Sequence, residues 1–127
     1  MLEEEIKMKF TWVTLHVSDI EQSLRFYREL LGLKIVREFG DENHKIVFLA
    51  GDNETQLELI CDKSERIENA GRGVSVGFGV TGLDEKIAGL KAAVTAPIAG
   101  PISPNPHIKF YLIPDPDGYT IQLYENS

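Results

Sequence analysis

Two polar side chains in this sequence have the types and positions needed for acid–base or ligand-binding chemistry. Glu58 lies between two leucines in TQLELIC, and His16 lies in TWVTLHV. A carboxylate in apolar surroundings needs a hydrogen-bond partner or a proton. We therefore consider two roles for Glu58: a general base that removes a proton next to a carbonyl, or a residue that only holds the structure together.

The segment around His16 predicts a strand with two different faces. Side chains of a strand alternate, so Val13, Leu15 and Val17 point one way, and Trp12, Thr14 and His16 point the other. Ser18 or Asp19 can cap the helix predicted next. His16 lies four residues beyond Trp12, about 13 Å along a strand, which is too far for His16 to take the place of Trp12 without a register shift. We expect His16 to hydrogen-bond a polar ligand at the wall or rim of a cavity.

Composition places the chain in a broad class. We expect one domain, residues 1–127, with 43% apolar residues and a net charge of −7. The acidic balance excludes nucleic acid as a natural partner, and no apolar run reaches the roughly 18 residues that cross a membrane. The first ten residues are acidic where a signal peptide is basic, so we expect a cytoplasmic location. The single cysteine, Cys61, excludes an internal disulfide, and we expect it to be a buried, inert thiol.

The order of elements predicted from hydrophobic periodicity occurs twice. A strand, a helix and three strands are predicted in residues 8–61 and again in 72–125, with helices at about 19–31 and 83–93. A polar linker at 62–72 joins the halves. One helix covers one face of each sheet and leaves the other uncovered. We therefore predict an α+β fold in which the two uncovered faces curl into a cup.

Three motifs in this order resemble the vicinal oxygen chelate superfamily, which includes glyoxalase I, bleomycin-resistance proteins and extradiol dioxygenases. They are L-x-V-x-D-x-x-x-S-x-x-F-Y from Leu15 to Tyr27, LLGLKIV from Leu30 to Val36, and DPDGYTIQLYE from Asp115 to Glu125. The resemblance covers about residues 10–125. It implies two βαβββ modules that form a curved mixed sheet around a small-molecule cavity, with helices on the outer face, commonly in a homodimer.

The resemblance also implies where a metal would bind. Metal-dependent members carry His, Glu, His or Gln, and Glu at four positions, which here correspond to Trp12, Glu58, Ser75 and Gln122. Glu58 alone is a ligand of the expected type, since an indole cannot coordinate and the other two are neutral. We predict no metal and no cofactor; nickel or zinc is expected only if the protein is a metal-dependent enzyme.

Strand parity predicts a largely apolar pocket with a few polar groups, which is typical of small-molecule sites. Gly77 and Gly79 remove side chains where a ligand could approach. In an alternative arrangement, Trp12 and Phe110 fill the cup and leave no cavity. The predicted ligand-binding residues are Trp12, Thr14, His16, Glu58, Ser75, Phe110, Leu112, Gln122 and Tyr124.

Three functional hypotheses remain open from the sequence. The favoured one is a glyoxalase/bleomycin-resistance-like protein that binds a small, largely apolar molecule without a catalytic metal. The alternatives are a metal-dependent enzyme similar to lactoylglutathione lyase, and a metal-free enzyme with Glu58 as general base. The sequence leaves catalysis and the identity of the ligand undecided.

Overall fold

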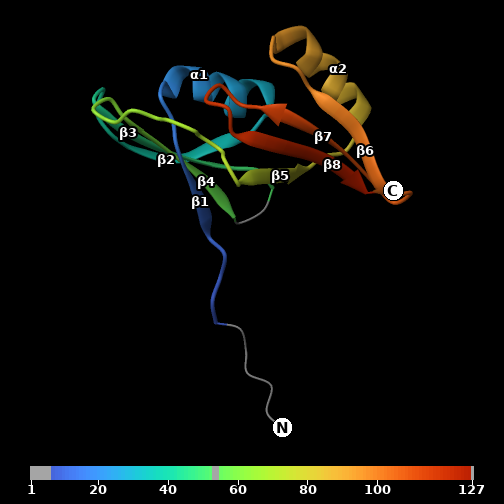
Figure 1. Cartoon of the computed structure of the whole chain (residues 1–127). Helices are drawn as coiled ribbons and strands as arrows, with labels where there is room; N and C mark the ends of the chain where they lie inside the picture. The colour runs from blue at the N-terminus through green and yellow to red at the C-terminus, as the bar shows by residue number, and fades with distance from the viewer. Residues whose placement is uncertain (1–6, 53–54, 127) are drawn as a thin grey trace.

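Each half of the chain folds as a strand, a helix and three further strands, as the repeated order predicts (Figure 1). The computed structural model describes residues 7–52 and 55–126. The first module contains β1 (Trp12–His16), α1 (Ile20–Leu24), η1 (Arg25–Leu30), β2 (Lys34–Gly40), β3 (His44–Ala50) and β4 (Gln56–Asp62). The second contains β5 (Ser75–Gly79), α2 (Leu83–Ala93), β6 (Ala99–Asn105), β7 (Ile108–Pro114) and β8 (Thr120–Asn126).

The strands form two mixed sheets of four, in the orders β1-β4-β3-β2 and β5-β8-β7-β6. The first strand of each module pairs in parallel with the last, and the remaining pairs are antiparallel. Trp12 lies opposite Gln56, and Ser75 lies opposite Thr120. The two registers make β1 equivalent to β5 and β4 equivalent to β8, which confirms the α+β fold of two βαβββ modules.

The helices begin where the sequence predicts, but the first changes its winding. The Asp19 carboxylate caps α1 by accepting from the backbone N–H of Gln22 at 3.1 Å, while residues 25–30 wind as a π-helix. In the second module Gly82 occupies the cap position and has no capping side chain of its own. The Glu125 carboxylate of β8 accepts from the N–H groups of Gly82 and Leu83 instead. A residue distant in sequence therefore satisfies the free backbone N–H groups at the start of α2.

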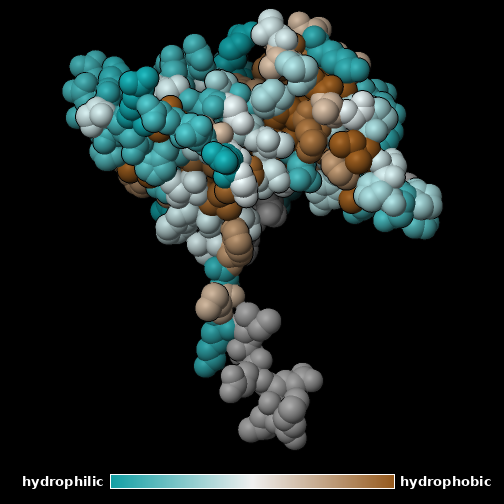
Figure 2. Space-filling view, in the orientation of Figure 1, coloured by the Kyte–Doolittle hydropathy of each residue, from teal (hydrophilic) through white to brown (hydrophobic). Residues whose placement is uncertain are grey.

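Residues from both modules share one hydrophobic core, on the side of the sheets that the helices cover (Figure 1). Leu15, Leu59, Cys61 and Leu123 are each less than 5% exposed, and alternation turns their neighbours to the opposite side, which we call the open face. Cys61 is the buried free thiol that the sequence predicts. On the visible surface, polar residues cover the first module, whereas hydrophobic residues gather over α2 and β6 (Figure 2).

The proline-rich segment of the second module forms the edge strand β6, which covers residues 99–105. Its prolines do not disturb the sheet because its outer edge has no neighbouring strand. Within the described ranges, no helix is long and apolar enough to cross a membrane.

Candidate functional site

Glu58 is held in place on the open face of the first sheet by the neighbouring strand. The register aligns Thr14, Glu58 and Phe48 on β1, β4 and β3. The Thr14 hydroxyl donates a hydrogen bond of 2.5 Å to Oε1 of Glu58. The carboxylate is half-buried and keeps Oε2 for another donor. This arrangement fixes one acceptor in the middle of the sheet.

An aromatic surface adjoins this carboxylate. Phe48 contacts Trp12 edge-to-face, with ring centroids 5.6 Å apart, and the Arg37 guanidinium carbon lies 4.1 Å from the Phe48 centroid. The ring centroids of Phe39 and Phe48 lie 6.1 Å apart, also edge-to-face. Phe48 is only 4% exposed, whereas Trp12 is 49% exposed, so the indole presents free surface to a ligand. We call Trp12, Arg37, Phe39 and Phe48 the aromatic platform.

Sequence reasoning found Trp12 but missed the rest of the aromatic platform. A β-bulge in β2 lies between Ile35, which pairs with Leu49, and Arg37, which pairs with Phe48. The bulge reverses the alternation of β2, so its pattern alone does not indicate which face Arg37 occupies. The position of Phe48 could have been predicted, because the antiparallel pairing of β3 with β4 places it opposite Glu58.

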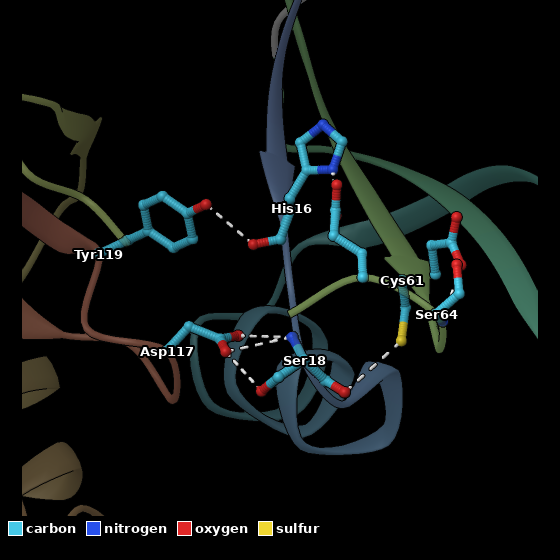
Figure 3. A network of polar contacts seen from close by, with 8 residues as sticks. His16, Ser18, Cys61, Ser64, Asp117 and Tyr119 are labelled. Atoms are coloured by element: carbon cyan, nitrogen blue, oxygen red, sulfur yellow. Dashed lines mark hydrogen bonds and ion pairs between the residues drawn. The ribbon is translucent and has the colours of Figure 1, made fainter. Parts of the chain in front are cut away.

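His16 lies away from Glu58 and pairs with Ile60 of β4. Its side chain is 47% exposed, and its Nδ1 lies 2.8 Å from Oε1 of Glu65. Its carbonyl accepts from the Tyr119 hydroxyl at 2.8 Å (Figure 3). His16 therefore takes part in contacts at the junction of the modules.

The predicted residues of the second sheet form their own group. Phe110 lies opposite Tyr124, and Leu112 lies opposite Gln122. The Gln122 amide donates to the Ser75 hydroxyl at 2.9 Å. The Tyr124 ring lies across Gly79, where an added Cβ would come within 3.1 Å of the ring. The predicted binding residues therefore belong to two separate sheet faces.

The residues at the family's metal positions do not fit a divalent metal. Trp12 and Ser75 are equivalent in the two modules, as are Glu58 and Gln122. Ser75 and Gln122 hydrogen-bond each other, and the indole offers only a donor N–H. Glu58 is left as the single anionic ligand, too few for a stable site. Across residues 7–52 and 55–126, no three His, Cys, Asp or Glu side chains are grouped to hold a metal ion.

The modules are joined at one end by a network of polar contacts (Figure 3). Asp117 accepts from the backbone N–H of Ser18 at 3.1 Å and from its hydroxyl at 2.5 Å. Beside them, the buried Tyr27 hydroxyl donates to Asp115 at 2.5 Å. Burial raises the pKa of Asp115 above its ordinary value, although hydrogen bonds from Tyr27, Tyr119 and Asp117 oppose the shift. Burial, followed by the nearby Asp115 charge, raises the pKa of Tyr27 far above its ordinary value.

A cavity of about 560 Å³ lies between the modules, and we call it the seam pocket. Of the nine predicted binding residues, Tyr124 alone contributes to its lining. The lining includes residues 31–33 after the first helix, Gly51, Asp52 and Thr55 between β3 and β4, residues 76–79 of β5 and Lys86 of α2. The volume falls in the range of small-molecule sites.

The whole fold matches a known family. The family model described as the glyoxalase/bleomycin resistance protein/dioxygenase superfamily matches residues 9–123. The chain belongs to this superfamily, as the motifs indicated.

Sequence relatives and solved structures agree with this assignment. A "Lactoylglutathione lyase" of Haemophilus influenzae is 27% identical over 94% of each chain. A "Probable lactoylglutathione lyase" of Vibrio parahaemolyticus is 32% identical, over 89% of this chain and 87% of the relative. The glyoxalase I of Leishmania major is 26% identical, with a TM-score of 0.72 over 94% of this chain and 87% of that chain. TnmS3, an antibiotic binding protein from Streptomyces, is 21% identical and shares the fold, with a TM-score of 0.77 over 97% of this chain and 100% of that one.

Proposed function

We propose that this protein binds a small amphipathic molecule on the open face of the first sheet and needs no catalytic metal to do so. The carrying observation is the half-exposed Trp12 beside a Glu58 carboxylate that Thr14 orients. A planar apolar body would stack on Trp12, and a hydrogen-bond donor of the ligand would face Oε2 of Glu58.

The charge of the site favours a cationic or donor-bearing ligand over an anionic one. Arg37 lies over Phe48, so its charge is partly engaged by that ring. The net charge of −7 adds a long-range attraction for cations. TnmS3, which shares the fold, is described as an antibiotic binding protein, and this supports a binding role.

Calorimetry with matched probes tests the proposal. We expect 1-naphthylmethylamine to bind more tightly than 1-naphthoate. Glu58→Gln should weaken the amine roughly tenfold or more, because it removes a charged hydrogen-bond acceptor. Thr14→Val should weaken it less, since it removes only the orienting hydroxyl. Gln122→Ala, at the equivalent position of the other sheet, is the control and should leave the affinity unchanged. Equal affinities for amine and naphthoate in every variant would refute the role of Glu58.

The second candidate is a metal-dependent lyase, because the two sequence relatives described above are named lactoylglutathione lyase. The donor set at Trp12, Ser75 and Gln122 opposes it. Turnover of the hemithioacetal of methylglyoxal and glutathione, measured with and without added nickel or zinc, separates the candidates. Turnover without metal that is lost in Glu58→Gln would instead assign Glu58 as a general base.

We also propose that two chains form a homodimer. Several large apolar side chains are about half exposed or more, among them Phe10, Phe39 and Val74. Light scattering should give a mass near twice 14.2 kDa at micromolar concentration. A mass of one chain across that range would contradict a stable dimer.

A further inference from the structure

The seam between the modules has two equivalent ends, and among the described residues side chains cross it at one of them. At the closed end, Tyr119 donates to the His16 carbonyl, and Tyr27 donates to Asp115 (Figure 3 shows the first of these contacts). The strand registers make His16 equivalent to Gly79, since His16 pairs with Ile60 and Gly79 with Tyr124. The residues of the other contacts can be matched between the two modules in the same way.

At the open end, each closing residue is replaced by a smaller one. Counted from the paired positions Gln56 and Thr120, Thr55 corresponds to Tyr119 and Gly51 to Asp115. Counted from the first residues of the helices, Leu90 corresponds to Tyr27. The Thr55 hydroxyl donates to the Phe10 carbonyl and so does not cross the seam. Thr55 and Gly51, the equivalents of Tyr119 and Asp115, both line the seam pocket.

The open end also presents hydrogen-bonding groups of the main chain. The Val80 N–H bonds to the Tyr124 carbonyl of β8. Bonding alternates in a parallel pair, so the N–H and C=O groups of Gly77 and Gly79 point to the free edge of β5. The equivalent carbonyl in β1, that of His16, points across the seam and accepts from Tyr119. Both glycines line the seam pocket, together with Tyr124, whose ring lies across Gly79.

A positive charge lines the seam pocket at the open end. Lys86 of α2 lines the seam pocket, and its equivalent in the first helix is the neutral Ser23. The ammonium donates to the Leu30 carbonyl at 2.6 Å, and within the described residues no carboxylate lies at ion-pair distance from it. The pocket lining also includes one acid, Asp52, which is exposed. An ammonium on an apolar wall favours an anionic partner.

We propose that the seam pocket is a second binding site, specific for a small amphipathic carboxylate. The carboxylate group pairs with Lys86, and the apolar body packs against Leu31, Leu33 and Phe78. The Gly79 edge accepts or donates a further hydrogen bond. The lining of the seam pocket includes none of Trp12, Thr14 and Glu58, so the two proposed sites are built from different residues.

Calorimetry with decanoate, decanol and decylamine tests the proposal. We expect decanoate to bind one per chain, decanol more weakly and decylamine not at all. Lys86→Met keeps the side-chain length and should weaken decanoate roughly tenfold or more while leaving decanol unchanged. Thr55→Tyr, which restores the tyrosine of the closed end, should abolish binding of both. Trp12→Ala should bind decanoate like the wild type, which separates this site from the open-face proposal.

Amide chemical shifts provide the readout if Thr55→Tyr does not fold. In the wild type, decanoate should shift the resonances of Gly77 and Gly79 and leave the Trp12 indole unaffected. The inference is overturned if decanoate does not bind, if it binds Lys86→Met as tightly as the wild type, or if Trp12→Ala abolishes its binding. The Gly79 amide could also be protected from hydrogen exchange in the absence of decanoate, to a degree that depends on protein concentration. That result would place a second copy of the chain in the seam and would also overturn the inference.

Discussion

Removal of one hydroxyl, in Tyr27→Phe, tests the polar junction between the modules. Tyr27 is fully buried and donates to Asp115, which is 6% exposed and also accepts from the backbone N–H groups of Asp117 and Tyr119. A buried hydrogen bond to a charged group contributes about 2 kcal/mol to the free energy of unfolding. With an unfolding entropy of about 2.1 cal/mol/K per residue, this corresponds to a fall in Tm of roughly 7 °C.

Tyr111→Phe is the matched control for this prediction. Tyr111 is also buried, but its hydroxyl lies 3.5 Å from Asp84, a largely exposed acid, so its loss should cost below about 0.5 kcal/mol. The Tyr27 hydrogen bond lowers the pKa of Asp115, so the difference between wild type and Tyr27→Phe should grow as pH rises and Asp115 ionises. Urea denaturation at several pH values measures both effects. Equal losses in the two variants, or a difference independent of pH, would refute the reasoning.

Three further changes have expected outcomes. Asp115→Asn should remove a pH dependence of the free energy of unfolding. Burial raises the folded-state pKa of Asp115, so its contribution to stability is most favourable below its unfolded pKa and declines as pH rises through the folded value. Denaturation of both proteins from pH 3 to 7 would measure the difference. Gly40→Ala should lower the free energy of unfolding by about 1–3 kcal/mol, because φ of Gly40 is +93° and a Cβ would lie 1.9 Å from the His44 carbonyl oxygen. Thermal unfolding measures the loss, and an unchanged Tm would contradict the prediction. Leu123→Ala, at 1% exposure, should cost roughly 2–5 kcal/mol in urea denaturation, and a smaller loss would mean that the core collapses around the change.

Periodicity and internal repetition were sufficient to predict the order of the elements. The strand at Trp12–His16 and the helix at Leu83–Ala93 follow from local patterns that packing reinforces. The π-helix at Arg25–Leu30 was not predicted. Each of its hydrogen bonds spans one residue more than in an α-helix, and the apolar spacing of so short a segment does not distinguish the two helix types.

The candidate site was predicted only where local alternation is regular. Trp12, Thr14 and Glu58 were assigned to one face from strand parity, and the registers place them there. Arg37 was missed because a bulge reverses the parity of its strand. The seam pocket depends on the difference between Thr55 and Tyr119, which becomes informative once the two modules are superimposed by their registers.

Elemental analysis after expression with added nickel, zinc and cobalt tests the central claim, that the site works without a metal. We predict that the wild type retains no stoichiometric metal after dialysis, because Glu58 is the single anionic side chain at the family's four metal positions. One equivalent of nickel, zinc or cobalt in the wild type, lost in Glu58→Gln, would contradict the account and favour a metal-dependent enzyme.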